Sequence, residues 1–410
     1  MTSDPSASVN GVKSYWLGTH RVVDPETTLA RVMPLAPRMG VTRVAVLTGL
    51  DTIGIPVAAA VRPNSRSIAV HQGKGGSLAA AKASAIMEAA EMFHAENIWL
   101  PLRLASFAEL RQDVMAVDPS ALPRTVAKLH DDQRLLWIEG RDVATGAAIW
   151  VPHELVSTDF TAPAPPGSGC FQATSNGLAA GNHRLEAVLH GLYEAIERDA
   201  VALWRCRGGV PGLSAVDPTS VDGTLSRKML SQFMQAGIAP HIWDITSDIA
   251  LPTFLCLAMP DDAAGGLEPE LGSGCHADRD VALARALSEA AQARLTRISG
   301  ARDDFLPQGY GSAARAGRLA AARAWLRSPA RRHYHASPSW TAPTLQQDLD
   351  LVLRCLARVG LQQIIWIDLS RPEFGIPVGR VVVPGLEGPW TPAGEGYTPG
   401  ARARAAMEMR

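Results

Sequence analysis

Several features of secreted, membrane and zinc-binding proteins are missing from this 410-residue sequence. Its five cysteines are scattered and form no C-x-x-C pair, which argues against a disulfide framework or a zinc site and favours a reducing compartment. The first residues lack a basic segment followed by an apolar one, so no signal peptide is expected. No run approaches the ~18 apolar residues that a membrane span needs. We therefore expect a soluble cytoplasmic protein that does not bind membranes.

An excess of charge of either sign is also missing. The net charge is −1, which gives no electrostatic footprint for nucleic-acid binding. Apolar residues make up 47% and charged residues 19%, as expected of a globular protein with a sizeable core. The phosphate-binding pattern G-x-x-x-x-G-K-[ST] does not occur, so any nucleotide site would have to be built without a Walker loop.

The order strand, glycine turn, helix occurs three times along the chain. Apolar runs punctuated by glycine and proline predict strands, for example at 43–48, 67–71, 253–258 and 379–383. Helices are expected at about 78–96, 183–204 and 280–298, the first with Ser77 as its cap. We expect residues 1–12 to form a flexible tail and 13–410 a single domain, because no proline- or glycine-rich linker divides them. The fold class is α/β, with three such units around one site.

Each of these three helices carries one polar stripe. Positions i, i+4 and i+7 lie on the same helix face. The first helix places Ser84, Glu88 and Glu91 there. The third helix repeats this spacing with Arg285, Glu289 and Gln292. The central helix begins near Asn182, and its polar sector of roughly 120° also contains Glu186, Glu194 and Glu197.

The simplest interpretation is that these glutamates are ordinary solvated positions on amphipathic helices. However, neighbouring pairs such as Glu88 and Glu91 repel each other, and few basic residues share their faces. A cation between the helices would relieve this repulsion. Magnesium fits best, because it prefers oxygen ligands and bridges carboxylates to phosphates. Zinc fits poorly, because neither Cys nor His residues cluster near these glutamates.

Glycine-rich segments precede two of the helices. Gly73-Lys74-Gly75 leads into the first helix, where its backbone N–H groups or Lys74 could face an anion, although a plain surface turn is the alternative. Ser175-Asn-Gly-Leu-Ala-Ala-Gly181 precedes Asn182, and its small residues would let the backbone approach a ligand closely.

The same residues resemble the motifs of the YcaO family. Ser84-Ala-Ile-Met-Glu88-Ala-Ala-Glu91 is similar to its S-x-x-x-E-x-x-E motif, although Met92 follows where arginine is usual. Asn182-x3-Glu186 and Glu194-x2-Glu197-Arg198-Asp199 are similar to N-x3-E and E-x-x-E-R-D. Further similarity lies in 288–294, 302–304 and 382–387.

This resemblance implies a fold of several α/β units, with mixed or antiparallel sheets and helices that form a central site for ATP and magnesium. In the family, a nucleophile attacks a peptide amide, ATP phosphorylates the amide oxygen, and phosphate is expelled. Magnesium ligation is assigned to Glu88, Glu91, Glu186, Glu194 and Glu197. Nucleotide contacts are assigned to Lys13, Arg21, Lys74, Ser84, Asn182, Arg198, Arg285 and Gln292. Surface roles are the alternative for Lys13, Arg21 and Lys74, and Arg198 could instead pair with Glu194. No catalytic acid or base is assigned.

The N-terminal segments resemble the YcaO proteins that are encoded beside TfuA partners. They are Lys13-Ser-Tyr-Trp-Leu-Gly18-Thr-His-Arg21, residues 42–56 and Arg62-Pro-Asn-Ser-Arg66. The resemblance implies thioamide formation in a precursor peptide or protein, with a TfuA-like partner and an external sulfur donor. The chain also lacks a P-x-P-x-P tail and room for a fused leader-binding domain, which favours the same product. An azoline-forming cyclodehydratase and a non-catalytic nucleotide-binding scaffold are the alternatives. We also expect a homodimer.

Overall fold

The computed structural model describes residues 10–126, 129–209, 215–260, 268–302, 311–326, 331–389 and 397–408. Residues 1–9 of the predicted flexible tail therefore lie outside the described residues, while Val12 forms a β-bridge with Thr344. Within the described parts of the chain, no helix is long and apolar enough to cross a membrane. The single domain at 13–410 stays a prediction.

The described residues form three sheets, which confirms the expected α/β class with largely antiparallel pairing. The first sheet has the order β1-β2-β3 and consists of β1 (Arg43–Val46), β2 (Val57–Val61) and β3 (Val70–Lys74). Helix α2 (Leu78–Glu96) covers this sheet, and α1 (Pro25–Val32) packs against α2.

The second sheet has the order β4-β5-β13-β14-β7, with β6 paired to β5. Its strands are β4 (Leu102–Ser106), β5 (Arg134–Asp142), β6 (Ala148–Pro152), β7 (Leu178–Ala180), β13 (Ile365–Asp368) and β14 (Val378–Val382). Helix α4 (Arg184–Cys206) packs against β14 and β7.

The third sheet has the order β11-β10-β9-β8-β12, in which β8 and β12 are the parallel pair. Its strands are β8 (Ala215–Val216), β9 (Ile238–Asp244), β10 (Thr253–Pro260), β11 (Glu270–Cys275) and β12 (Arg331–Arg332). Helix α6 (Arg279–Ser299) covers β11 and β10, and α5 (Thr224–Gln235) packs against α6 and β9.

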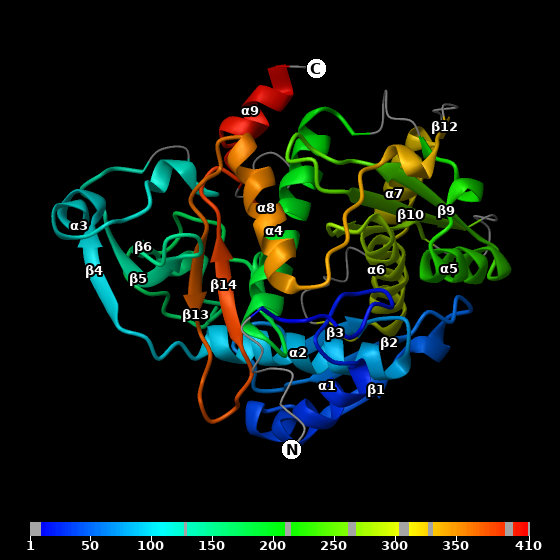
Figure 1. Ribbon diagram of the computed structural model, residues 1–410, viewed down its shortest axis with the longest axis horizontal. Coiled ribbons are helices and arrows are strands. Elements are labelled where there is room, and N and C mark those ends of the chain that lie inside the picture. Colours follow the sequence, from blue (N-terminus) through cyan, green and yellow to red (C-terminus); the bar gives the residue numbers. More distant parts are fainter. Residues whose placement is uncertain are drawn as a thin grey trace.

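The remaining helices lie around these units (Figure 1). They are α3 (Phe107–Asp113), α7 (Ser312–Trp325), α8 (Leu345–Arg358), α9 (Ala401–Glu408) and the 3₁₀ turns η2 (Met33–Met39), η3 (Thr48–Leu50), η4 (Pro119–Ala121), η5 (His153–Leu155), η6 (Pro218–Ser220) and η9 (Tyr334–Ala336).

The three predicted helices are confirmed as α2, α4 and α6, each preceded by a strand (β3, β7 and β11), and of these strands only β3 overlaps one expected from the sequence. Each strand lies at the edge of its sheet, and each helix starts after a short loop. Ser77, as predicted, accepts a hydrogen bond from the backbone N–H of Ala80 at 3.1 Å. His183 and Asp278 cap α4 and α6 in the same way, at 3.1 Å and 2.8 Å. In Figure 1, α4 and α6 stand almost upright above the horizontal α2.

Glycines let these edge strands approach their helices closely. A Cβ atom on Gly73 would lie 2.1 Å from the backbone nitrogen of Ala85 and 2.2 Å from the carbonyl oxygen of Ala81, both in α2. Gly272 and Gly274 of β11 face α6 equally tightly. The prediction of a turn at Gly73-Lys74 is therefore wrong. Both residues belong to β3, and the glycine is needed for strand–helix packing rather than for a bend.

Candidate functional site

A cavity of about 530 Å³ opens where the three capped helices meet. Its wall contains most of the residues that the sequence singled out, contributed by α2, α4, α6, β3 and the N-terminal segment. These are Arg21, Lys74, Ser84, Glu88, Glu91, Asn182, Glu186, Glu194, Arg198, Arg285 and Gln292. The structure thus gathers three distant segments around one space. Lys13 and Glu197 are not part of this wall.

Three carboxyl groups on one side of the cavity are electrostatically unfavourable when charged. Burial and the nearby charge of Glu194 raise the pKa of Glu88 to about 7, although Arg302 and Lys74 oppose this shift. Burial, Glu88 and Glu194 raise the pKa of Glu91 well above its usual value. Burial and Glu197 also raise the pKa of Glu194. These carboxylates would be stabilised by a cation placed among them.

Glu91 and Glu186 also accept hydrogen bonds from the backbone. Glu91 Oε1 accepts from the N–H of Ala180 at 2.7 Å, which ties α2 to the free edge of β7. Glu186 accepts from the N–H groups of Val22 at 2.7 Å and Asn182 at 2.8 Å. These two side chains therefore join the units together while still facing the cavity.

Glu197 lies deeper and is only 1% exposed. Its oxygens accept hydrogen bonds from the Ser273 hydroxyl at 2.7 Å, the Cys275 N–H at 3.0 Å and Arg198 at 2.6 Å. This arrangement ties α4 to the edge of β11. Helical spacing alone could not show this, because it does not indicate which strand edge lies against the stripe. The metal-ligand role assigned to Glu197 stays a prediction that this geometry does not favour.

Basic side chains also line the cavity. Lys74 Nζ lies 2.7 Å from Glu289 Oε2, joining β3 to α6, and Arg198 Nη1 lies 4.0 Å from Glu289 Oε1. Burial disfavours the charge of Glu289, but Lys74 and Arg198 outweigh it and lower the pKa of this carboxyl. Arg198 thus pairs with Glu197 and Glu289 rather than with Glu194, the partner considered from the sequence. Arg285 has a buried Nε atom with no hydrogen-bond partner.

The N-terminal segment contributes one of its two predicted basic residues. Arg21 lines the cavity, with its Nη2 atom 3.3 Å from His190 Nδ1. Lys13 is buried elsewhere, with Nζ 2.5 Å from Asp348 Oδ2 and 3.3 Å from His20 Nδ1. This buried ion pair fastens the N-terminal segment to α8. The nucleotide contact assigned to Lys13 is not supported by its position.

Two polar side chains on the cavity wall are held by protein partners. Asn182 Nδ2 donates to the Thr28 hydroxyl at 2.9 Å. Gln292 Nε2 donates to the carbonyl of Gln72, on the free edge of β3, at 3.1 Å. Ser84 also lines the cavity. The nucleotide contacts assigned to these residues stay predictions.

Sequence reasoning left several cavity residues without a role. Glu289 was visible as part of the α6 stripe, but its pairing with Lys74 joins segments too far apart for spacing to reveal. His190 lies between Glu186 and Glu194 on α4, four residues from each, so the same helical arithmetic would have found it. Arg302 lines the cavity from beyond the end of α6.

The donor set of the cavity fits a nucleotide with magnesium. Within the described ranges, no three His, Cys, Asp or Glu side chains are gathered closely enough to form a metal cage. Magnesium does not require one, since it usually combines one or two carboxylates with phosphate oxygens and waters. Glu88 and Glu194, with their disfavoured charges, would hold the cation. Lys74, Arg198 and Arg285 provide the donors that phosphates need.

Comparisons with known proteins agree with this geometry. A family model described as YcaO cyclodehydratase, ATP- and Mg²⁺-binding, matches residues 72–387. An uncharacterized protein in the tfuA 3′ region of Rhizobium leguminosarum bv. trifolii is 35% identical, over 94% of this chain and 92% of its own. An uncharacterized protein from Methanothermobacter thermautotrophicus is 33% identical, over 90% of this chain and 95% of its own.

Solved structures show the same fold. YcaO from Methanopyrus kandleri, bound with AMPPCP and Mg²⁺, aligns with a TM-score of 0.73 at 23% identity, over 92% of this chain and 94% of that chain. A heterocyclase in complex with substrate and cofactor aligns with a TM-score of 0.75 at 22% identity, over 93% of this chain and 54% of that chain. The cofactors in the description of the family model, ATP and Mg²⁺, are those predicted from the sequence.

Proposed function

Because the chain belongs to the YcaO family of ATP- and Mg²⁺-binding proteins, we propose that it activates a backbone amide of a peptide or protein by ATP-dependent phosphorylation of the amide oxygen. The product is a thioamide, formed together with a TfuA-like partner and an external sulfur donor. The observation that carries this proposal is one cavity lined by both acidic and basic side chains from three separate strand–helix units.

The acidic and the basic side chains each have a task in this chemistry. When bound, ATP supplies the phosphoryl group that makes the amide oxygen a good leaving group, and Mg²⁺ neutralises charge on the transferring group. Glu88 and Glu194 would hold the cation, Glu91 holds the edge of β7, and Glu186 holds the N–H groups of Val22 and Asn182. Lys74 and Arg198 bind anionic oxygens, and Glu289 sets how much of their charge is available because it already pairs with both.

The thioamide product is supported by the relative from the tfuA 3′ region, which matches this chain along almost its whole length. An azoline-forming cyclodehydratase is the second candidate, because the matching family model is described as a cyclodehydratase. In that reaction, a Cys, Ser or Thr side chain of the substrate would replace the external sulfur donor as the nucleophile.

Mass spectrometry of the substrate separates these candidates. The purified chain would be incubated with a TfuA-like protein, a candidate precursor peptide, ATP, Mg²⁺ and sulfide. We expect peptide-dependent release of ADP and phosphate, and a peptide made heavier by exchange of oxygen for sulfur. A lighter, dehydrated peptide would establish the azoline reaction instead. Absence of ATP turnover, with or without peptide, would favour the non-catalytic nucleotide-binding scaffold.

A further inference from the structure

His71 lies next to Glu88, a residue of the cavity wall, and has no role in the function proposed above. It belongs to β3, and its side chain is 0% exposed. Its Nδ1 atom has no hydrogen-bond partner and lies 4.0 Å from Glu88 Oε1. At this distance the two atoms are not hydrogen-bonded, but a small side-chain movement would bring them within hydrogen-bonding range. A buried imidazole nitrogen without a partner, facing a carboxylate of the site, calls for an explanation.

Arg62 determines which nitrogen of His71 carries the proton. Its Nη1 atom lies 3.5 Å from His71 Nε2. A guanidinium can only donate hydrogen bonds, so Nε2 must be the acceptor. An Nε2 atom that accepts a hydrogen bond carries no proton, so the ring is neutral. A neutral imidazole that accepts at Nε2 has its proton on Nδ1, the nitrogen that faces Glu88.

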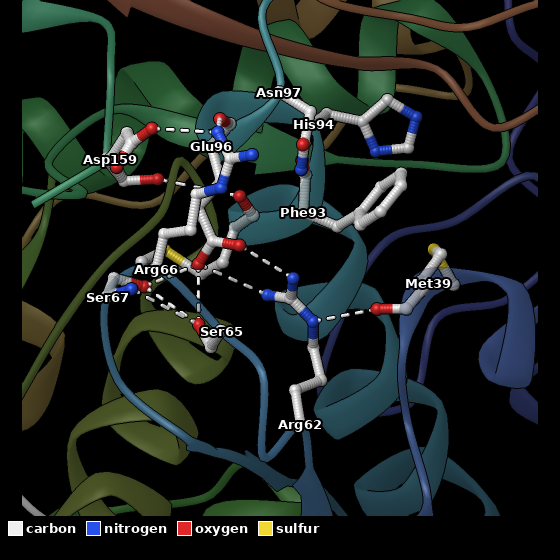
Figure 2. A network of polar contacts seen from close by, with 12 residues as sticks. Met39, Arg62, Ser65, Arg66, Ser67, Phe93, His94, Glu96, Asn97 and Asp159 are labelled. Carbon is white, nitrogen blue, oxygen red and sulfur yellow. Dashed lines mark hydrogen bonds and ion pairs between the residues drawn. The ribbon is translucent and has the colours of Figure 1, made fainter. Parts of the chain in front are cut away.

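Arg62 cannot turn away from this position. Figure 2 shows its guanidinium between Glu96 and the backbone of Met39. Nη2 lies 2.7 Å from Glu96 Oε2, and Nε donates to the Met39 carbonyl at 2.9 Å. Arg62 and Glu96 are only 4% and 3% exposed.

Glu96 is itself held by two hydroxyl groups from the turn that follows Arg62 (Figure 2). Ser65 and Ser67 donate to Glu96 Oε1 at 2.6 Å and 2.7 Å. The segment Arg62-Pro-Asn-Ser-Arg66 thus anchors a line of contacts that runs from Glu96 through Arg62 and His71 to Glu88.

We infer that His71 is a positioning residue for Glu88: its Nδ1–H, directed by Arg62, orients the Glu88 carboxylate for cation binding. This inference rests on the proposed function, because it assigns Glu88 to the cation. Groups behind a metal ligand fix its orientation, and losing them typically weakens metal binding by about 10- to 100-fold. His71 touches neither substrate nor phosphate in this scheme.

Two isosteric substitutions test the direction of the hydrogen bond. In His71→Asn, an amide N–H can occupy the place of Nδ1–H. In His71→Gln, the amide reaches the place of Nε2 instead. Binding of Mn²⁺ to the full chain would be measured by electron paramagnetic resonance, with a non-hydrolysable ATP analogue present. We expect His71→Asn to retain affinity within about threefold, and His71→Gln and His71→Leu to lose about tenfold or more.

Two controls separate this effect from a general loss of packing. His94→Gln is the matched control, because His94 is also buried, on α2, and its ring packs against Phe93 and Phe374. Its Mn²⁺ affinity should equal that of the unsubstituted protein. Glu88→Gln should lose affinity, and if it does not, the proposed function fails at this residue. If Glu88→Gln loses affinity while all His71 variants bind normally, only the inference about His71 is overturned.

The tautomer itself can be observed without any variant. Long-range ¹H–¹⁵N spectra of histidine-labelled protein distinguish protonated Nδ1 from protonated Nε2. The expected result is a neutral His71 ring protonated at Nδ1, assigned by nuclear Overhauser contacts between the ring and its neighbours in β3. A proton on Nε2 would contradict the inference, even if the His71 variants proved too unstable to purify.

Discussion

At the scale of single residues, the glutamates of the site divide into those that face the cavity and those that also hold backbone N–H groups. Glu194 belongs to the first kind, and burial disfavours its charged form. Glu186 belongs to the second kind, because it accepts from two backbone N–H groups. The two kinds should therefore respond differently to the same substitution.

Glu194→Gln is expected to lower ATP turnover by about tenfold or more, because it removes a cation ligand. It should leave the free energy of unfolding unchanged or slightly higher, since it also removes a disfavoured charge. Steady-state ADP release and chemical denaturation measure the two effects. Normal ATP turnover in Glu194→Gln would show that Glu194 is not a metal ligand.

Glu186→Gln provides the contrast. One carboxylate oxygen is replaced by an NH₂ group that must face a backbone N–H of Val22 or Asn182. A buried N–H group then loses its acceptor, and the free energy of unfolding should fall by about 1–3 kcal/mol. Urea denaturation checks this value. An unchanged midpoint would show that Glu186 does not join these segments.

The raised pKa of Glu88 predicts a pH dependence of stability. The folded state binds this proton more tightly than the unfolded chain does, because the pKa rises from 4.5 to about 7 on folding. The stability that comes from protonating Glu88 is therefore fully present below pH 4.5 and is lost as the pH rises through about 7.

Denaturation of the wild-type chain and Glu88→Gln across this range would test the pH prediction. The wild type should lose more stability with rising pH than the variant, and Mg²⁺ with a nucleotide analogue should reduce the difference. If the free energy of unfolding changed equally with pH in the two proteins, the raised pKa of Glu88 would be contradicted.

At the scale of elements, the site depends on how closely each edge strand approaches its helix. Gly73→Ala would place a Cβ atom against the backbone of α2, which cannot move aside as a flexible side chain can. We expect the free energy of unfolding to fall by about 3 kcal/mol or more. Gly317→Ala is the control, because Gly317 lies inside α7 with nothing near its missing Cβ. That change should stabilise the protein by about 0.5–1 kcal/mol.

Helix α9 is attached to α4 by a buried ion pair. Arg402 Nη2 lies 2.9 Å from Asp199 Oδ2, and the side chain of Asp199 is 0% exposed. Arg402→Ala would leave this charge buried without its partner, at a cost of about 3–5 kcal/mol. Arg404→Ala on the exposed side of α9 should change stability by less than about 0.5 kcal/mol. Thermal denaturation compares the two, and equal melting temperatures would mean that α9 contributes nothing to the fold.

The elements also show what sequence reasoning can reach. Helices α2, α4 and α6 were predictable almost to the residue, because their apolar periodicity is long and their caps are local. The strand expected at 67–71 instead begins at Val70, since isolated short apolar runs do not reveal their pairing partner. The prediction of a turn at Gly73-Lys74 was wrong for a related reason. In the sequence, a glycine required for close packing looks the same as one required for a turn.

At the scale of the whole molecule, one site is shared by three units whose strands all lie at sheet edges. The sequence indicated which helix faces are polar, and the structure shows that they share one cavity. What could not be predicted are the contacts between units, such as Lys74 with Glu289 and Glu197 with Cys275. These depend on how three sheets are oriented, which residue spacing within one helix does not encode. The same limit explains why Lys13, although near Arg21 in sequence, points away to Asp348.

The central claim is that this cavity transfers a phosphoryl group to a backbone amide oxygen of the substrate. The most direct measurement follows that oxygen atom. A substrate peptide labelled with ¹⁸O at its backbone carbonyls would be incubated with the chain, a TfuA-like partner, ATP, Mg²⁺ and sulfide, and the inorganic phosphate analysed by mass spectrometry. Our account predicts that each modified amide transfers its ¹⁸O to phosphate. Unlabelled phosphate released alongside a modified peptide would contradict it.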